Sequence, residues 1–140
     1  MANYVLDSYA MLAFFRNETG GEKVKQLLHE AATDKHELYM TYINAGEVFY
    51  MSYRKDGAAK AEVAWKALLQ FPIHLIDADL DFSLTAARIK ARYYISYADA
   101  FAAALTIKRK ATLITGDNEF DALIGEAGFK VKYLYPLNIK

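Results

Sequence analysis

The sequence predicts an α/β fold, a three-layer α/β/α sandwich in which helices cover both faces of a central parallel sheet. Short apolar segments alternate with longer segments of helical periodicity along the whole chain. The short segments are apolar without polar alternation, as is typical of strands with both faces buried. With 140 residues, of which 54% are hydrophobic and 24% charged, the chain is long enough to bury one core. We therefore expect a single domain over residues 1–140.

The first half of the chain predicts two strands and four helices. An apolar strand over residues 4–6 ends at Asp7. Residues 21–33 carry apolar side chains at i, i+3, i+4 and i+7, which indicates an amphipathic helix. Pro72 ends the fourth helix. The expected elements are strands 4–6 and 38–41 and helices 8–15, 21–33, 43–54 and 58–71.

The second half continues the alternation. It predicts strands at 73–76 and 112–115, helices at 80–92 and 97–109, a short helix at 120–127 and an edge strand at 130–133. Gly128 is the expected C-cap of the short helix.

Composition excludes several classes of function. The chain has no cysteine, so disulfides, thiolate zinc sites and cysteine nucleophiles are ruled out. Its net charge is zero, which gives no support for broad, non-specific binding of nucleic acid. No basic leader is visible, and no apolar run approaches the roughly 18 residues of a membrane span. We expect a cytoplasmic protein without membrane contact.

Four acids fall where strands end or where helices begin. Asp7 follows the first strand, and Asp117 follows the fourth. Glu47 lies one turn into the helix after the second strand, and Asp99 lies in the first turn of the sixth helix. Ligand sites of open parallel sheets form beyond the carboxyl ends of the strands, so these side chains are candidates for one shared site.

Helix capping is the alternative explanation for each acid taken singly. Asp7 and Asp117 suit the N-cap position, because a carboxylate there accepts a bond from a free backbone N–H. Asn44-x-x-Glu47 and Ser96-x-x-Asp99 both match a capping box. Only the convergence of all four helix starts on one sheet edge favours a common site.

Such convergence predicts a bound metal ion. Two carboxylates about 5 Å apart repel by roughly 3 kcal/mol at an effective dielectric near 20. A whole domain is stable by only about 5–15 kcal/mol. The cluster therefore requires protonation, strong hydrogen bonding or a divalent cation. Ligands that are all oxygen select hard ions, so we expect Mg²⁺ or Mn²⁺.

At these residues the sequence resembles a PIN domain, and within that family the VapC-type toxins of prokaryotic toxin–antitoxin pairs. The resemblance extends nearly from end to end and rests on four segments in order. These segments are Tyr4-Val5-Leu6-Asp7-Ser8-Tyr9-Ala10, Asn44-Ala45-Gly46-Glu47-Val48, Tyr97-Ala98-Asp99-Ala100 and Leu113-Ile114-Thr115-Gly116-Asp117-Asn118-Glu119-Phe120. Each is weak alone, and together they are specific.

The resemblance implies a PIN-like sandwich that hydrolyses RNA endonucleolytically with Mg²⁺ or Mn²⁺. It implies that the metal is held, directly or through water, by Asp7, Glu47, Asp99 and Asp117. Ser8 or Thr115 would supply supporting hydroxyls. The implied partners are RNA, a small antitoxin that blocks the site, and a second copy of the chain.

Three features leave alternatives open. Tyr9 occupies a position where the family often has a small polar residue, so we expect no hydroxyl ligand from it. Glu119 and Asp121 are further acids near the fourth segment, for which solvent exposure is the simpler expectation. The aromatic segment 49–53 indicates a deeply buried helix or a homodimer contact.

The rival function is a non-catalytic PIN-fold module whose acidic pocket holds a basic partner segment. A phosphoacceptor domain of the response-regulator kind fits less well, because Asp7 has no acidic neighbour.

Overall fold

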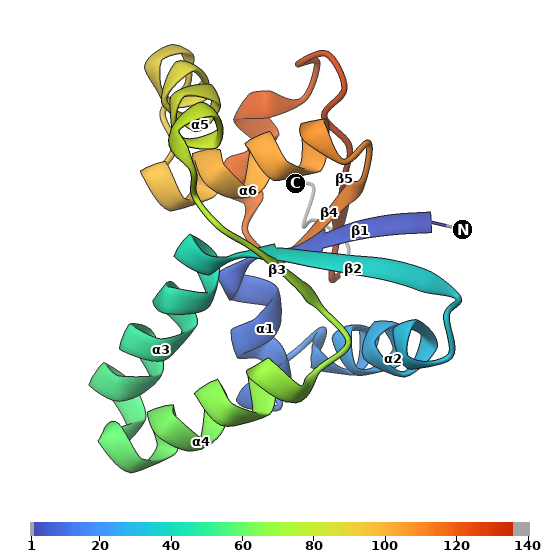
Figure 1. Ribbon diagram of the computed structural model, residues 1–140, viewed down its shortest axis with the longest axis vertical. Helices are drawn as coiled ribbons and strands as arrows, with labels where there is room; N and C mark the ends of the chain where they lie inside the picture. The colour runs from blue at the N-terminus through green and yellow to red at the C-terminus, as the bar shows by residue number, and fades with distance from the viewer. Residues whose placement is uncertain (1, 136–140) are drawn as a thin grey trace.

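A computed structural model describes residues 2–135, in which helices enclose a five-stranded sheet (Figure 1). The strands are β1 (Ala2–Leu6), β2 (His36–Thr41), β3 (His74–Ile76), β4 (Thr112–Thr115) and β5 (Val131–Tyr133). The helices are α1 (Ser8–Phe15), α2 (Gly21–Ala32), α3 (Tyr42–Asp56), α4 (Ala58–Gln70), α5 (Leu80–Arg92), α6 (Tyr97–Lys108) and the 3₁₀ helix η1 (Asn118–Leu123).

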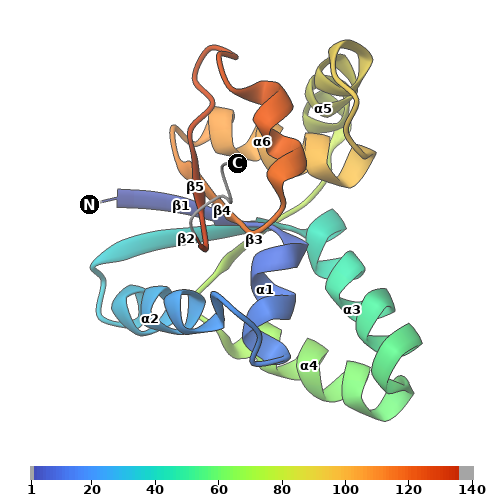
Figure 2. The ribbon, with the colours of Figure 1, turned by 180° about the vertical axis from the view of Figure 1, so that it is seen from behind.

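The sheet confirms the predicted parallel α/β/α sandwich. Its strand order is β3-β2-β1-β4-β5, and all four pairings are parallel. Figures 1 and 2 show α1 to α4 on one face of the sheet and α5, α6 and η1 on the other. Because β1 lies between β2 and β4, the carboxyl ends of these three strands meet at the centre of one edge.

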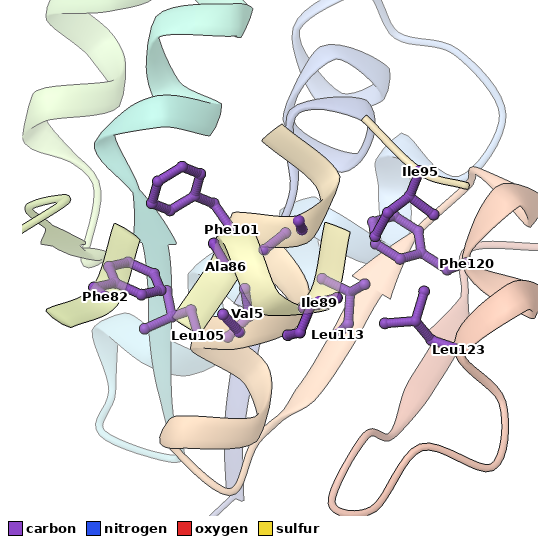
Figure 3. Packing of buried hydrophobic residues seen from close by; sticks show 14 of the residues in the cluster. Val5, Phe82, Ala86, Ile89, Ile95, Phe101, Leu105, Leu113, Phe120 and Leu123 are labelled. Carbon is purple, nitrogen blue, oxygen red and sulfur yellow. The ribbon is translucent and has the colours of Figure 1, made fainter. Parts of the chain in front are cut away.

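Consecutive residues of the central strands supply two separate cores. Val5 and Leu113 pack with α5, α6 and η1, as Figure 3 shows, whereas Leu6 and Ile114 pack with α1 to α4. Side chains alternate between the faces of a strand, so a strand covered on both faces needs apolar residues at every position. This requirement explains the continuous apolar runs of the sequence.

The start of α3 corrects one expectation about capping. Thr41, not Asn44, is the N-cap residue, and its hydroxyl oxygen accepts a bond from the Asn44 backbone N–H at 2.9 Å. The helix therefore begins at Tyr42, one residue before the predicted start. The Asn44 side chain therefore does not cap the helix, and its amide group contacts Glu47 and Ala98 instead.

Other boundaries differ where polar residues extend an element. Both β1 and β2 begin two residues before the predicted starts, because Ala2 and Asn3 pair with His36 and Glu37 beyond the apolar core.

The predicted helix over 120–127 is wrong. Asn118–Leu123 form a 3₁₀ helix, and Gly125 then takes a φ of 101°, a left-handed conformation that suits glycine and ends the helix. Gly128 has a φ of 81° but is not a helix cap.

None of the helices within residues 2–135 is both long and apolar enough to cross a bilayer.

Candidate metal centre

A cleft of about 370 Å³ lies beyond the carboxyl ends of β1, β2 and β4. Helices α1 and α3 border it from one side of the sheet, and α6 and the turn after β4 border it from the other (Figure 2). Its lining includes Asp7, Ser8, Glu47, Asp99 and Asp117, and also Arg16, Glu18, Ser96 and Glu119. The fold thus brings together the four acids that are far apart in the sequence.

Three acids form the tightest group. One carboxylate oxygen each of Asp99, Asp117 and Glu119 lies within 4.8 Å of the others. Glu119 is exposed, as the sequence predicts, yet its carboxylate belongs to this group. The turn of η1 places it there, because the Glu119 backbone N–H donates to Asp117 Oδ1 at 2.9 Å. Asp121 instead accepts a hydrogen bond from the Tyr133 hydroxyl, outside the cleft.

Asp7 is both a helix cap and a member of the cluster. Its side chain is 1% exposed. Oδ1 accepts the Ala10 backbone N–H at 2.8 Å, and Oδ2 accepts the Thr115 hydroxyl at 2.5 Å. The Thr115 oxygen in turn accepts the Asp117 backbone N–H at 3.0 Å. One buried hydroxyl therefore connects the two acids that follow β1 and β4.

Glu47 is oriented by Ser8 and Asn44. The Ser8 hydroxyl donates to Glu47 Oε1 at 2.8 Å, and Asn44 Nδ2 donates to the same oxygen at 3.3 Å. Asn44 is fully buried, and its Nδ2 also donates to the Ala98 carbonyl oxygen at 3.3 Å. Asn44 therefore ties α3 to the residue that precedes Asp99, a role that the capping interpretation missed.

Asp99 makes only one of the two hydrogen bonds of the predicted capping box. Its backbone N–H donates to Ser96 Oγ at 3.0 Å, so Ser96 is the N-cap of α6. Within residues 2–135 its own carboxylate accepts no bond from the Ser96 backbone. The carboxylate instead lies in the cleft, although the residue is only 9% exposed.

Burial and mutual repulsion raise the pKa values of two of the acids. Burial raises the pKa of Asp7 from 3.8 to about 7, against the hydrogen bonds from Thr115 and Ala10. Burial also raises the pKa of Asp99 from 3.8 to about 7, and the charges of Asp117 and Glu47 add to this rise. At neutral pH the two carboxyls are poised between the protonated and the ionised form.

The donor set fits a hard divalent cation. Every candidate ligand in the cleft is a carboxylate or hydroxyl oxygen, the donor type that Mg²⁺ and Mn²⁺ prefer. Among the described residues that line the cleft, Arg16 is the one cation. The protein alone therefore leaves most of the negative charge uncompensated.

Tyr9 lines the cleft, and its hydroxyl contacts a tyrosine outside the group of acids. That hydroxyl contacts the Tyr135 hydroxyl at 2.8 Å, and Tyr135 donates to the Gly116 carbonyl oxygen at 2.8 Å. The Tyr9 ring covers Gly116, where an added Cβ would lie 2.2 Å from Tyr9 Cε1. A larger residue in the turn between Thr115 and Asp117 would therefore require the Tyr9 ring to move away from Gly116.

The sequence matches the PIN domain over residues 4–125. The chain therefore belongs to the PIN domain family, as the four segments predict. It matches no curated protein in sequence.

Among solved structures, the fold is similar to VapC-containing toxin–antitoxin proteins. DNA-bound VapBC from Salmonella typhimurium superposes with a TM-score of 0.73 at 13% identity, covering 96% of this chain and 100% of the other. VapBC2 from Rickettsia felis, bound to a promoter DNA fragment, superposes with a TM-score of 0.71 at 14% identity, covering 94% of this chain and 98% of the other. VapC20 from Mycobacterium tuberculosis superposes with a TM-score of 0.70 at 17% identity, covering 85% of this chain and 93% of the other. The fold of this chain is thus similar to that of these VapBC and VapC structures.

The Thr115 hydroxyl provides a test of the buried link. We expect Thr115→Val to lower the free energy of unfolding by about 1–3 kcal/mol, because Asp7 loses a buried hydrogen-bond donor. Thr115→Ser keeps the hydroxyl and is expected to lose less. Chemical denaturation of both variants measures the difference, and equal losses would show that the hydroxyl does not matter.

Asp99→Asn is expected to stabilise the metal-free protein. The pKa of Asp99 is raised because its carboxylate is buried near other carboxylates. Near pH 8 Asp99 is ionised, so removing its charge should raise the free energy of unfolding by about 1–2 kcal/mol. Thermal denaturation should show a rise of several degrees. Asp121→Asn, outside the cleft, is the matched control. A fall in melting temperature for Asp99→Asn alone would favour a purely capping role.

Stability should depend on pH and on metal together. Because the folded-state pKa of Asp7 is about 7, above its ordinary 3.8, the folded protein binds more protons between these values. Its free energy of unfolding should therefore fall as pH rises through this range, by about 4 kcal/mol for Asp7 alone.

A divalent ion requires the ionised carboxylates, so Mn²⁺ should raise the melting temperature much more at about pH 8 than at about pH 5. Melting curves with Mn²⁺, and with NaCl at matched ionic strength, measure this. Equal stabilisation at the two pH values would contradict a carboxylate site.

Proposed function

We propose that this PIN domain is a metal-dependent endoribonuclease and the toxin of a VapBC-type toxin–antitoxin pair. One observation carries the proposal: Asp7, Glu47, Asp99 and Asp117 share a single cleft at the sheet edge of a PIN fold. A similar structure, VapC20, is described as a toxin that cleaves the sarcin–ricin loop. The chemistry of the cleft suits the same class of reaction.

We assign the ion, Mg²⁺ or Mn²⁺, to the cleft acids. Asp99, Asp117 and Glu119 converge closely enough to share one ion, while Asp7 lies deeper and Glu47 faces the group from α3. When bound, such an ion lowers the pKa of a water molecule and offsets the charge that develops on a phosphate.

The protein's own contribution is to orient the acids. Thr115 fixes the Asp7 carboxylate and the Asp117 backbone, so these two groups keep a set spacing. Ser8 and Asn44 both donate to Oε1 of Glu47, and no group within residues 2–135 donates to Oε2, which suits Oε2 to accept a proton from the attacking water. Ser8 and Thr115 thus act through the acids rather than as ligands.

We also propose protein partners and a location. The similar VapBC structures are toxin–antitoxin proteins, and an antitoxin that covers the cleft would silence this chain. Helices α3 and α4 expose Tyr50, Tyr53, Val63 and Leu69, which suits a contact with a second copy. A cytoplasmic location stays a prediction from the sequence.

Cleavage of RNA tests the proposed function. The purified protein should cut a hairpin RNA with Mg²⁺ or Mn²⁺, and EDTA should abolish cutting. Asp99→Asn should reduce the rate by more than about 100-fold, since even residues behind metal ligands cost 10–100-fold when replaced. Asp121→Asn should retain the rate, because Asp121 lies outside the cleft.

The rival function makes the opposite prediction. A folded wild-type protein that neither cuts RNA nor binds Mn²⁺ in calorimetry would be a binding module for a basic segment rather than a nuclease.

A further inference from the structure

The acidic cleft cannot attract RNA by its own charge. Its described lining holds six carboxylates, Asp7, Glu18, Glu47, Asp99, Asp117 and Glu119, against the single cation Arg16. A bound divalent ion offsets only part of this charge. If the proposed function holds, groups beside the acids must hold the strand, and the structure offers such groups on both sides.

Arg16 is the first of these groups. It lines the cleft at the C-cap of α1, forms no ion pair within residues 2–135, and its Nε is buried without a hydrogen-bond partner. Its one hydrogen bond, from Nη2 to the Met51 carbonyl oxygen, is long at 3.5 Å. A guanidinium left free in this way suits bidentate binding of a phosphate.

Arg16 and the buried acid Asp7 lie at opposite ends of α1. Nine residue steps separate their backbones, which at 1.5 Å per residue is about 13 Å along the helix axis. Arg16 therefore enters the cleft from the end of α1 that is far from the strand ends, a position that suits the RNA backbone on one flank of the cut.

A second hollow continues the cleft on its other side. It shares Ser96 and Glu119 with the cleft and holds about 590 Å³. The turn between α5 and α6 forms it, with Lys90 and Tyr94 among its lining residues. Figures 1 and 2 place this turn and the C-terminal end of α1 on opposite sides of the sheet. The acids therefore lie between Arg16 and the hollow.

Tyr94 is fully exposed although its ring is largely apolar. The turn that carries it is held in place from both sides. Lys90 Nζ donates to the Ile95 carbonyl oxygen at 2.9 Å, and the Ile95 side chain is buried in the core. Arg92 and the Tyr93 hydroxyl both bind the Glu126 carboxylate. An exposed aromatic ring on a turn that is held in place, beside a lysine, is an arrangement that suits stacking of an unpaired base.

We propose that one unpaired RNA strand crosses the cleft, with a flanking phosphate on Arg16 and a base of the opposite flank stacked on Tyr94. Lys90 adds positive charge to the hollow and holds the turn. Stacking on Tyr94 requires that the base on this flank of the cut is free of a duplex partner.

Binding to short fluorescent oligoribonucleotides tests the proposal in the cleavage-impaired Asp99→Asn protein. Tyr94→Ala should weaken binding about 5- to 140-fold, and Tyr94→Phe should retain it, because stacking needs the ring and not the hydroxyl. Arg16→Ala should reduce the salt dependence, the slope of log K against log salt, by about 0.7, and Arg16→Lys should restore it. Tyr94→Ala should leave this slope unchanged.

Controls separate these effects from general losses. Tyr42→Ala removes an exposed ring from α3 and Arg88→Ala removes an exposed guanidinium from α5; both residues lie outside the two hollows, and both variants should bind RNA as the parent does. The same oligonucleotide annealed to its complement should bind much more weakly than the single strand.

Three results would overturn the proposal while the proposed nuclease stands. In the first, the wild-type protein cleaves RNA, but Tyr94→Ala and Arg16→Ala bind RNA as the controls do. In the second, the duplex and the single strand bind equally well. In the third, Tyr94→Ala abolishes self-association in sedimentation and leaves RNA binding intact. Absence of both cleavage and RNA binding in the wild-type protein would instead reject the nuclease itself.

Discussion

The structure depends on the enforced proximity of carboxylates at one sheet edge. Because β1 lies between β2 and β4, the residues that follow these strands converge, and the acids among them cannot separate without unpairing the sheet. Burial and repulsion raise the pKa of both Asp7 and Asp99 to about 7, so ionising these acids in the folded protein costs free energy. The two apolar cores, one on each face of the sheet, offset this destabilisation.

Neutral polar groups decide how the acids are arranged. The Thr115 hydroxyl joins the carboxylate of Asp7 to the backbone of Asp117, and Asn44 joins Glu47 to the first turn of α6 at Ala98. The Thr115–Asp7 and Asn44–Ala98 contacts link elements that are distant in sequence, so the tertiary fold helps to set the spacing of the acids. A site built on strand ends and helix starts is preorganised, which suits a metal that tolerates little misplacement.

Much of the fold could be predicted, because strands buried on both faces leave an unmistakable apolar pattern. Val5-Leu6 and Leu113-Ile114 each send one side chain to each core, and the sequence therefore reads as strand without alternation. The 3₁₀ helix after Asp117 could not be predicted, because apolar spacing over 120–127 resembles one helical turn and the break comes from the conformation of Gly125. Likewise, the pairing of Ala2-Asn3 with His36-Glu37 lies outside the apolar runs and carries no hydropathy signal.

The acids could be predicted as a group, but their individual geometry could not. Capping and clustering look like rival explanations of Asp7 in the sequence, and the structure shows that one carboxylate does both with its two oxygens. Glu119 joins the acids only because of the η1 turn, and Arg16 meets the cleft only because α1 ends beside it. Such placements follow from tertiary packing, and no pattern along the chain reports them.

Anomalous diffraction from crystals grown or soaked with Mn²⁺ would locate the ion relative to the acids. We expect an anomalous peak in the cleft, within bonding distance of carboxylate oxygens from Asp99 and Asp117, with Asp7 beneath it. Strong peaks only at other sites, or a cleft filled by a bound lysine or arginine with no peak, would contradict it.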